Sequence, residues 1–114
     1  MATYAIVGHR DFTDYRLFRS FVDQYEMDIS CIVSGGARGA DTLAERYAKE
    51  CNIPFILHPA LWDVYGKSAG PRRNKLIVAD ADKMIAFLAP GSRGTANSIS
   101  LARQKGIPVY ICPV

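Results

Sequence analysis

The sequence predicts a Rossmann-like α/β domain with three α/β/α layers, on the strength of its length and its pattern of apolar runs. A chain of 114 residues has the size of one domain, so we expect residues 1–114 to form a single domain. Five apolar runs, rich in Ile, Val and Phe, mostly lack polar alternation, as strands that are covered on both faces do. We expect these runs to be the strands: Tyr4–Val7, Ser30–Val33, Pro54–Leu57, Lys83–Leu88 and Pro108–Cys112.

Amphipathic segments lie between these runs, and we expect them to be helices. They are Asp14–Tyr25, Thr42–Cys51, Pro71–Ala81 and Ala96–Lys105. Pro71 suits a first helical turn, and Gly106 is placed to end the last helix. Strands that alternate with helices imply parallel pairing through right-handed crossovers. We therefore expect a five-stranded parallel sheet in the order 3-2-1-4-5, with the switch point between strands 1 and 4.

Composition and charge exclude several classes of protein. The chain is 49% hydrophobic and 22% charged, as is usual for a soluble globular protein. No apolar run approaches the roughly 20 residues that span a bilayer, and the N-terminus lacks the features of a signal peptide, so we expect a cytoplasmic protein without a membrane partner. The net charge of +3 is too small to indicate double-stranded DNA binding by itself.

The three cysteines Cys31, Cys51 and Cys112 are an odd number without metal-binding spacing. We expect all three to be reduced and buried, and we expect no metal and no cofactor.

Ligands of open parallel sheets bind at the carboxyl ends of the strands, near the switch point, so the loops after the strands are the candidate site. The loop after the first strand begins Gly8-His9-Arg10. Gly8 allows a sharp turn, and Arg10 can meet a phosphate. The alternative is an ordinary turn with an arginine in solvent.

The loop after the second strand holds three glycines in five residues, between a buried strand and a helix. Such a loop points backbone N–H groups outward, and the helix dipole favours an anion. It is neither a Walker A nor a GxGxxG motif. The alternative is a tight turn in which Asp41 or Thr42 caps the helix, Thr42 and Glu45 forming a capping box. The residues are Ser34, Gly35, Gly36, Ala37, Arg38, Gly39, Ala40 and Asp41.

The segment after the third strand, which runs to about Gly70, is long for a connection and rich in aromatic and basic residues. Trp62 and Tyr65 are candidates for stacking on a base. The alternative makes both aromatics hydrophobic lids over the edge of the sheet. Just beyond it, Arg73 and Asn74 are the residues of this region that we expect in a binding site.

The loop after the fourth strand is a second glycine loop that opens onto a helix, Gly91-Ser92-Arg93-Gly94-Thr95. If the strand order holds, it faces the loop after the second strand across one anion site. Seven of the 14 Lys and Arg residues fall in these loops or at the following helix starts, which favours an anionic ligand. They are Arg10, Arg38, Lys67, Arg72, Arg73, Lys75 and Arg93.

In combination these motifs resemble the YspA-like branch of the SLOG superfamily, which includes the DNA-processing protein A group and the lonely-guy phosphoribohydrolases. The resemblance covers nearly the whole chain and rests on Gly8-His9-Arg10, on residues 34–41, on Gly70-Pro71-Arg72-Arg73-Asn74 and on Gly94-Thr95. It implies a Rossmann-like fold that binds nucleotides or nucleotide-derived ligands, and it implies self-association into a homo-oligomer. Some members of the superfamily cleave the N-glycosidic bond of nucleoside monophosphates, and others bind single-stranded DNA.

The sequence departs from the lonely-guy enzymes where these carry a catalytic glutamate after Gly-Thr, since Ala96-Asn97-Ser98 follow here. A glycosidase needs a carboxylate near the cleaved bond. Asp41 is the best substitute, with Arg73 holding the phosphate; Asp11 and Glu45 are the others. We therefore expect a module that senses or sequesters a phosphorylated nucleotide, an ADP-ribose-like compound or a cyclic nucleotide. A nucleoside 5′-monophosphate phosphoribohydrolase is the alternative, and a single-stranded DNA-binding protein the second alternative.

Overall fold

The computed structural model describes residues 1–114, and its five strands form one parallel sheet in the order β3-β2-β1-β4-β5. This confirms the predicted fold class, strand order and switch point between β1 and β4. The strands are β1 Ala2–Gly8, β2 Ile29–Ser34, β3 Phe55–Leu57, β4 Lys83–Leu88 and β5 Val109–Pro113. None of the helices combines the length and the apolar character that a membrane span requires.

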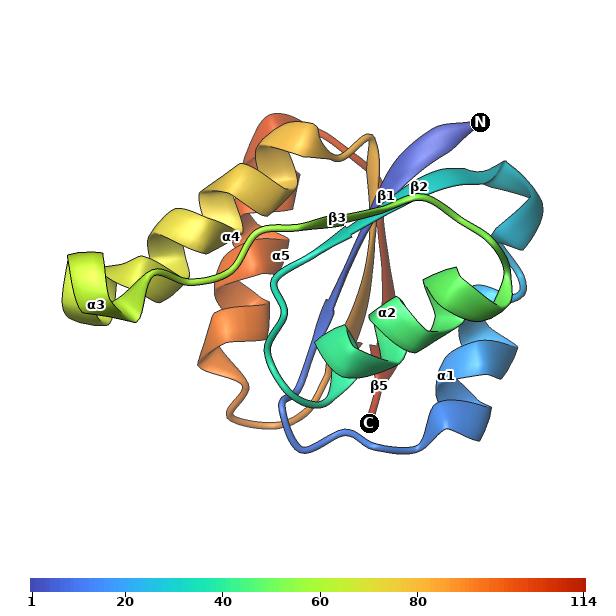
Figure 1. Ribbon diagram of the computed structural model, residues 1–114, viewed down its shortest axis with the longest axis horizontal. Coiled ribbons are helices and arrows are strands. Elements are labelled where there is room, and N and C mark those ends of the chain that lie inside the picture. The colour runs from blue at the N-terminus through green and yellow to red at the C-terminus, as the bar shows by residue number, and fades with distance from the viewer.

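Helices cover both faces of the sheet, as predicted for a three-layer domain. Figure 1 shows α1 and α2 on one face, α4 and α5 on the other, and the short α3 projecting beyond the start of α4. Their bounds are α1 Tyr15–Val22, α2 Ala40–Glu50, α3 Trp62–Tyr65, α4 Ala69–Asp80 and α5 Arg93–Lys105. Single 3-10 turns occupy Glu26–Asp28 and Gly66–Ser68. The connection after β3 is therefore partly helical, where the sequence predicts only a loop.

The alternative in which Asp41 or Thr42 caps α2 is wrong. The helix begins at Ala40 and its N-cap is Gly39, whose φ of +77° belongs to glycine, so Thr42 already lies inside the helix. The Thr42 hydroxyl donates to the carbonyl of Ala37 and Glu45 pairs with Lys49, so these residues form no capping box.

The other helices differ from prediction mainly at their ends. α1 ends at Val22, three residues early, because the chain turns into a 3-10 turn before β2. α5 begins at Arg93 and not at Ala96. Pro71 lies in the first turn of α4, as predicted, and Gly106 ends α5 with a left-handed φ of +83°.

The core lies in two layers because alternate residues of each strand point to opposite faces. Tyr4 and Ile6 of β1 pack with Phe18 of α1 on one side, whereas the next residues along β1 face α4 and α5. The edge strand β3 is less covered than predicted, since Ile56 and Leu57 are 41% and 46% exposed. The expectation for the cysteines is also partly wrong: Cys112 is buried, but Cys31 and Cys51 are only half-buried.

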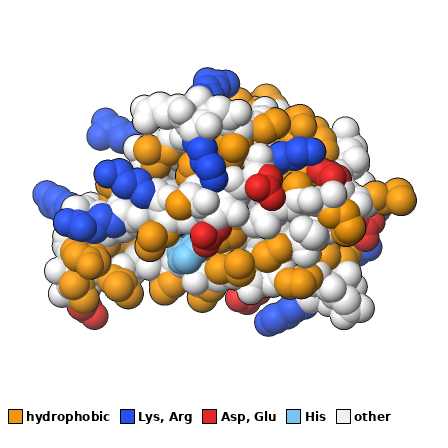
Figure 2. Space-filling view, turned by 90° about the horizontal axis from the view of Figure 1, so that it is seen from above, with side chains coloured by type: hydrophobic (Ala, Val, Ile, Leu, Met, Phe, Trp, Pro, Cys, Tyr) orange, Lys and Arg blue, Asp and Glu red, His pale blue; other side chains and the backbone are white.

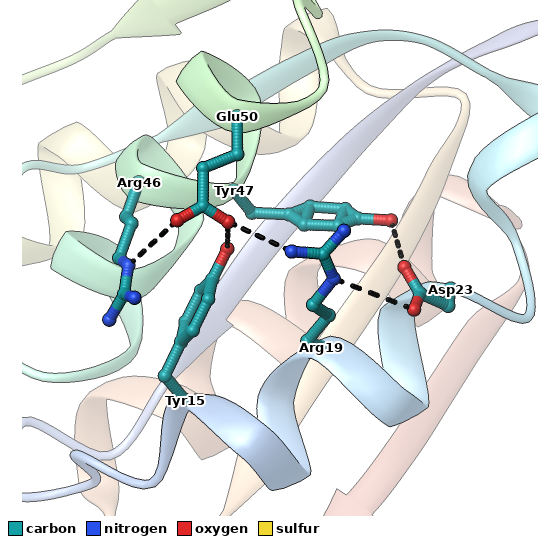
Figure 3. Close-up of polar contacts among 6 residues, drawn as sticks. All are labelled: Tyr15, Arg19, Asp23, Arg46, Tyr47 and Glu50. Carbon is teal, nitrogen blue, oxygen red and sulfur yellow. Dashed lines mark hydrogen bonds and ion pairs between the residues drawn. The ribbon is translucent and has the colours of Figure 1, made fainter.

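A polar network joins α1 to α2 above this core (Figure 3). Tyr47, whose ring is fully buried, donates its hydroxyl to Asp23 at 2.7 Å, and Tyr15 donates to Glu50 at 2.7 Å. The guanidinium of Arg19 lies between the two acids, 3.0 Å from the Glu50 carboxylate and 3.7 Å from that of Asp23. The network holds α1, which connects β1 to β2, against α2, which connects β2 to β3.

Candidate functional site

A cavity of about 390 Å³ lies at the carboxyl ends of the central strands, a size within the range of small-molecule sites. Segments from four elements form it: the end of β1, the start of α2, the middle of α4 and the start of α5. The lining residues are Val7, Gly8, His9, Arg10, Ala37, Asp41, Arg73, Asn74, Ile77, Gly91, Ser92, Arg93, Gly94, Thr95 and Ser98. The loops after β2 and β4 therefore flank one cavity, where the strand order predicts them to meet.

The backbone of His9 fixes the loop after β1 against two neighbouring elements. Its N–H donates to the carbonyl of Phe87 in β4 at 2.9 Å, and its carbonyl accepts from the N–H groups of Phe12 and Ala40. The side chains of His9 and Arg10 therefore reach the cavity from a rigid support.

The loop after β2 contributes less surface than its composition predicts. Only Ala37 and Asp41 of residues 34–41 line the cavity. Arg38 is exposed and pairs with Asp11 at 2.9 Å. Ser34 is buried, and its hydroxyl donates to the carbonyl of Ile6. Gly36 faces Leu57 instead of the cavity.

Two other glycines of this loop make room for site residues. A Cβ at Gly35 would collide with the guanidinium of Arg73, and a Cβ at Gly39 would collide with the carbonyl of Arg10. These two glycines thus allow Arg73 and the Arg10 backbone to approach the loop closely, a role that a glycine-rich segment also predicts.

Asp41 is the one carboxylate that lines the cavity, and it is 7% exposed. It accepts a hydrogen bond from the N–H of Ala37 at 3.1 Å. Burial raises the pKa of the Asp41 carboxyl above its usual value, although the Ala37 N–H and the charge of Arg73 oppose this shift.

The guanidinium of Arg73 is positioned by hydrogen bonds that join α4 to the loop after β2 and to α5. Its Nη1 donates to the carbonyl of Gly35 at 2.9 Å, and its Nε donates to Oδ1 of Asn74 at 3.0 Å. Asn74 is buried and in turn donates to Oδ1 of Asn97 at 3.0 Å. A guanidinium has five N–H groups, so three remain for a ligand.

The start of α5 forms the opposite wall. Gly91, Ser92, Arg93, Gly94 and Thr95 all line the cavity. The first N–H groups of a helix lack intrahelical acceptors, and the helix dipole attracts anions to this end. The hydroxyl of Ser92, the N-cap, makes no capping bond and lies 3.0 Å from Nδ1 of His9.

Several predicted residues lie outside the cavity. Trp62 and Tyr65 are on α3, are 58% and 43% exposed, and do not line the cavity. Arg72 stacks on the Tyr65 ring, 4.2 Å from its centroid. Of the seven clustered cations, Arg10, Arg73 and Arg93 reach the cavity, whereas Arg38, Lys67, Arg72 and Lys75 do not.

Three lining residues, Val7, Ile77 and Ser98, are not among the site residues predicted from the sequence. Ser98 stands one helical turn after Thr95, and Ile77 one turn after Asn74, so the i, i+3 spacing on each helix indicates them. Val7 precedes Gly8 at the end of β1.

Comparisons with known proteins agree with the predicted family and fold. The family described as YspA, cpYpsA-related SLOG matches residues 5–65. The gene 61 protein of Mycobacterium phage D29 is 42% identical over an 84-residue alignment, and the match covers 68% of this chain and 67% of that protein.

Two solved structures share the fold. DNA processing protein A from Streptococcus pneumoniae superposes with a TM-score of 0.82 over 98% of this chain at 22% identity. The protein of that name from Helicobacter pylori, whose structure describes a single-stranded DNA binding mode, gives 0.72 over 98% at 21% identity. The present chain spans 50% and 65% of these two proteins. From the matched residues and the phage relative, the chain belongs to the YspA, cpYpsA-related SLOG family.

Proposed function

We propose that residues 1–114 form one module that binds a phosphorylated nucleotide or nucleotide-derived ligand in this cavity, to sense it or to sequester it. The observation that carries the proposal is the convergence of Arg73 and the start of α5 on one cavity. Arg10 and Arg93 add two positive charges, against the single carboxylate of Asp41. A phosphate that meets a guanidinium and a helix N-terminus gains charge-assisted hydrogen bonds from both.

Titration with AMP, ADP-ribose and a cyclic nucleotide, followed by calorimetry and by thermal unfolding, tests this function. A ligand that binds only the folded state raises the unfolding temperature. If none of these compounds binds or stabilises the chain, the proposal is wrong.

Arg73→Ala is expected to weaken binding of AMP roughly 10- to 100-fold, because a hydrogen bond to a charged group contributes about 1.5–3 kcal/mol. Arg73→Lys keeps the charge but loses the planar fork, so we expect an intermediate affinity. Arg72→Ala is the matched control, since Arg72 is exposed and does not line the cavity. Equal losses in the Arg72 and Arg73 variants would contradict the site.

Cleavage of a nucleoside monophosphate is a second candidate function, favoured by the buried carboxylate of Asp41 in the cavity. A carboxylate there can stabilise the positive charge that develops on a ribose as its glycosidic bond breaks. Chromatography after incubation with AMP measures this reaction directly. Free adenine that disappears in Asp41→Asn supports an enzyme, whereas intact AMP removes this candidate.

Single-stranded DNA binding is favoured by a different surface. Trp62 and Tyr65 are exposed, and Lys67, Arg72 and Lys75 are exposed near them in sequence. Figure 2 shows Lys and Arg side chains together with apolar side chains at the left end of the molecule, where Figure 1 places α3. Bases stack on exposed aromatic rings, and cations meet the phosphates. Salt-dependent anisotropy with a labelled oligonucleotide, lost in Trp62→Ala, supports this function; an unchanged affinity in Trp62→Ala contradicts it.

A further inference from the structure

Ser92 and His9 form a hydrogen-bonded pair inside the cavity that anion binding does not require. The Ser92 hydroxyl lies 3.0 Å from Nδ1 of His9, and both residues line the cavity. A serine at an N-cap normally accepts a hydrogen bond from a backbone N–H of its helix. Ser92 makes no such bond, so its hydroxyl is free to donate its proton to the imidazole.

The surroundings of His9 suit a base. Its backbone is held by the three hydrogen bonds to Phe87, Phe12 and Ala40. Its other ring nitrogen, Nε2, lies 3.6 Å from Oδ2 of Asp11. The other oxygen of this carboxylate, Oδ1, pairs with Arg38 at 2.9 Å. The negative charge on the Nε2 side favours the tautomer with its proton on Nε2, and Nδ1 can then accept a proton. Hydroxyl, imidazole and carboxylate thus stand in the order of an activated nucleophile.

The start of α5 supplies the remaining requirement of such a site. Ser92 directly precedes the helix, and Gly94 and Thr95 line the same cavity. Unpaired N–H groups and the helix dipole stabilise negative charge that develops beside the serine.

We propose that Ser92 is a nucleophile, with His9 as its base, in the hydrolysis of a carboxylic ester of a phosphorylated compound. The phosphate part of this substrate class rests on the proposed function. The Ser92 oxygen bonds to the ester carbon while His9 takes the hydroxyl proton. The carbon–oxygen bond to the leaving alcohol then breaks, and His9 returns the proton to that alcohol. Water, deprotonated by His9, releases the acid and restores the serine.

Covalent labelling of the full chain with a fluorophosphonate tests the nucleophile, read as intact mass and mapped to a peptide. One adduct on Ser92 is expected, together with hydrolysis of p-nitrophenyl acetate, and both are expected to be absent from Ser92→Ala. His9→Asn keeps an oxygen that can accept the serine hydrogen bond but removes the base. For this variant we expect the rate constant of inactivation by the fluorophosphonate, kinact, to fall at least about 100-fold.

Two further variants separate chemistry from structure. Ser100→Ala removes an exposed serine of the same helix and is expected to label like the wild type. Asp11 acts through His9 as a positioning residue. Asp11→Asn is therefore expected to lower kinact and to leave KI, the dissociation constant of the fluorophosphonate before it reacts, unchanged. A loss of folding in any variant is visible by circular dichroism and removes that variant from the comparison.

The outcomes distinguish this inference from the proposed function. No adduct, an adduct elsewhere, or hydrolysis no faster than that by Ser92→Ala overturns the nucleophile, even if AMP stabilises the chain. If Ser92 is labelled but AMP does not slow the labelling, the nucleophile stands and the nucleotide occupant is wrong. Labelling of Ser92 that AMP slows supports both.

Discussion

At the scale of single residues, Asp41 has the most consequential environment. It is a 7% exposed acid among three arginines that also line the cavity, and it is held by the N–H of Ala37. Burial raises the pKa of its carboxyl. The folded protein therefore keeps a proton on Asp41 at pH values where the unfolded chain has lost it.

This difference predicts a pH dependence of stability. The contribution of Asp41 is most favourable below the unfolded pKa of an aspartate, about 4, and declines as the pH rises through the folded value. Asp41→Asn has no carboxyl that titrates at this position. The free energy of unfolding of the variant, relative to that of the wild type, is therefore expected to increase between pH 4 and pH 7. Urea unfolding across this range measures it, with Asp63→Asn, an exposed carboxylate of α3, as the control for loss of a charge. A difference that stays constant with pH would contradict the assignment.

The structure brings part of the predicted polar residues to the cavity, but it does not bring the predicted aromatic residues there. Arg73, Asn74 and Asp41 all line the cavity, because the start of α2 and the middle of α4 meet at the carboxyl edge of the sheet. Trp62 and Tyr65 do not, because the connection after β3 folds into its own short helix that projects from the body (Figure 1). Composition alone carries no information about that direction.

At the scale of elements, glycines determine how the strands pass into helices. Gly39 and Gly91 have nearly the same positive φ, +77° and +78°. A Cβ at Gly39 would collide with the Arg10 carbonyl, whereas a Cβ at Gly91 would meet nothing within 4 Å. The sequence identifies both loops but cannot tell these roles apart, because the collision involves a loop 29 residues earlier. For the same reason the start of α2 at Ala40 could not be predicted.

Gly39 and Gly91 allow a direct comparison of two alanine variants. Gly91→Ala is expected to lower the free energy of unfolding by about 1–2 kcal/mol, the cost of a left-handed alanine. Gly39→Ala incurs this cost and must also displace the Arg10 backbone, so we expect a clearly larger loss and weaker ligand binding. Chemical denaturation of both variants checks this. If Gly39→Ala is no less stable than Gly91→Ala, the close packing of the two loops is wrong.

At the scale of the whole molecule, the apolar runs and their spacing suffice for the fold class and the strand order. Parallel strands linked by right-handed crossovers leave few arrangements of five βα units. The arrangement that forms places the loops after β2 and β4 on either side of β1. The exposure of the edge strand β3 could not be predicted, because a short apolar run has the same sequence pattern in an edge strand as in a central strand.

The central claim is that Arg73 and the N-terminus of α5 bind one phosphate between them. A crystal structure of the chain soaked with AMP tests it most directly. We expect the phosphate to lie within hydrogen-bond distance of both the Arg73 guanidinium and the backbone N–H groups of residues 93–95. An empty cavity at millimolar AMP, or a nucleotide bound only against Trp62 and Tyr65 of α3, would contradict the account.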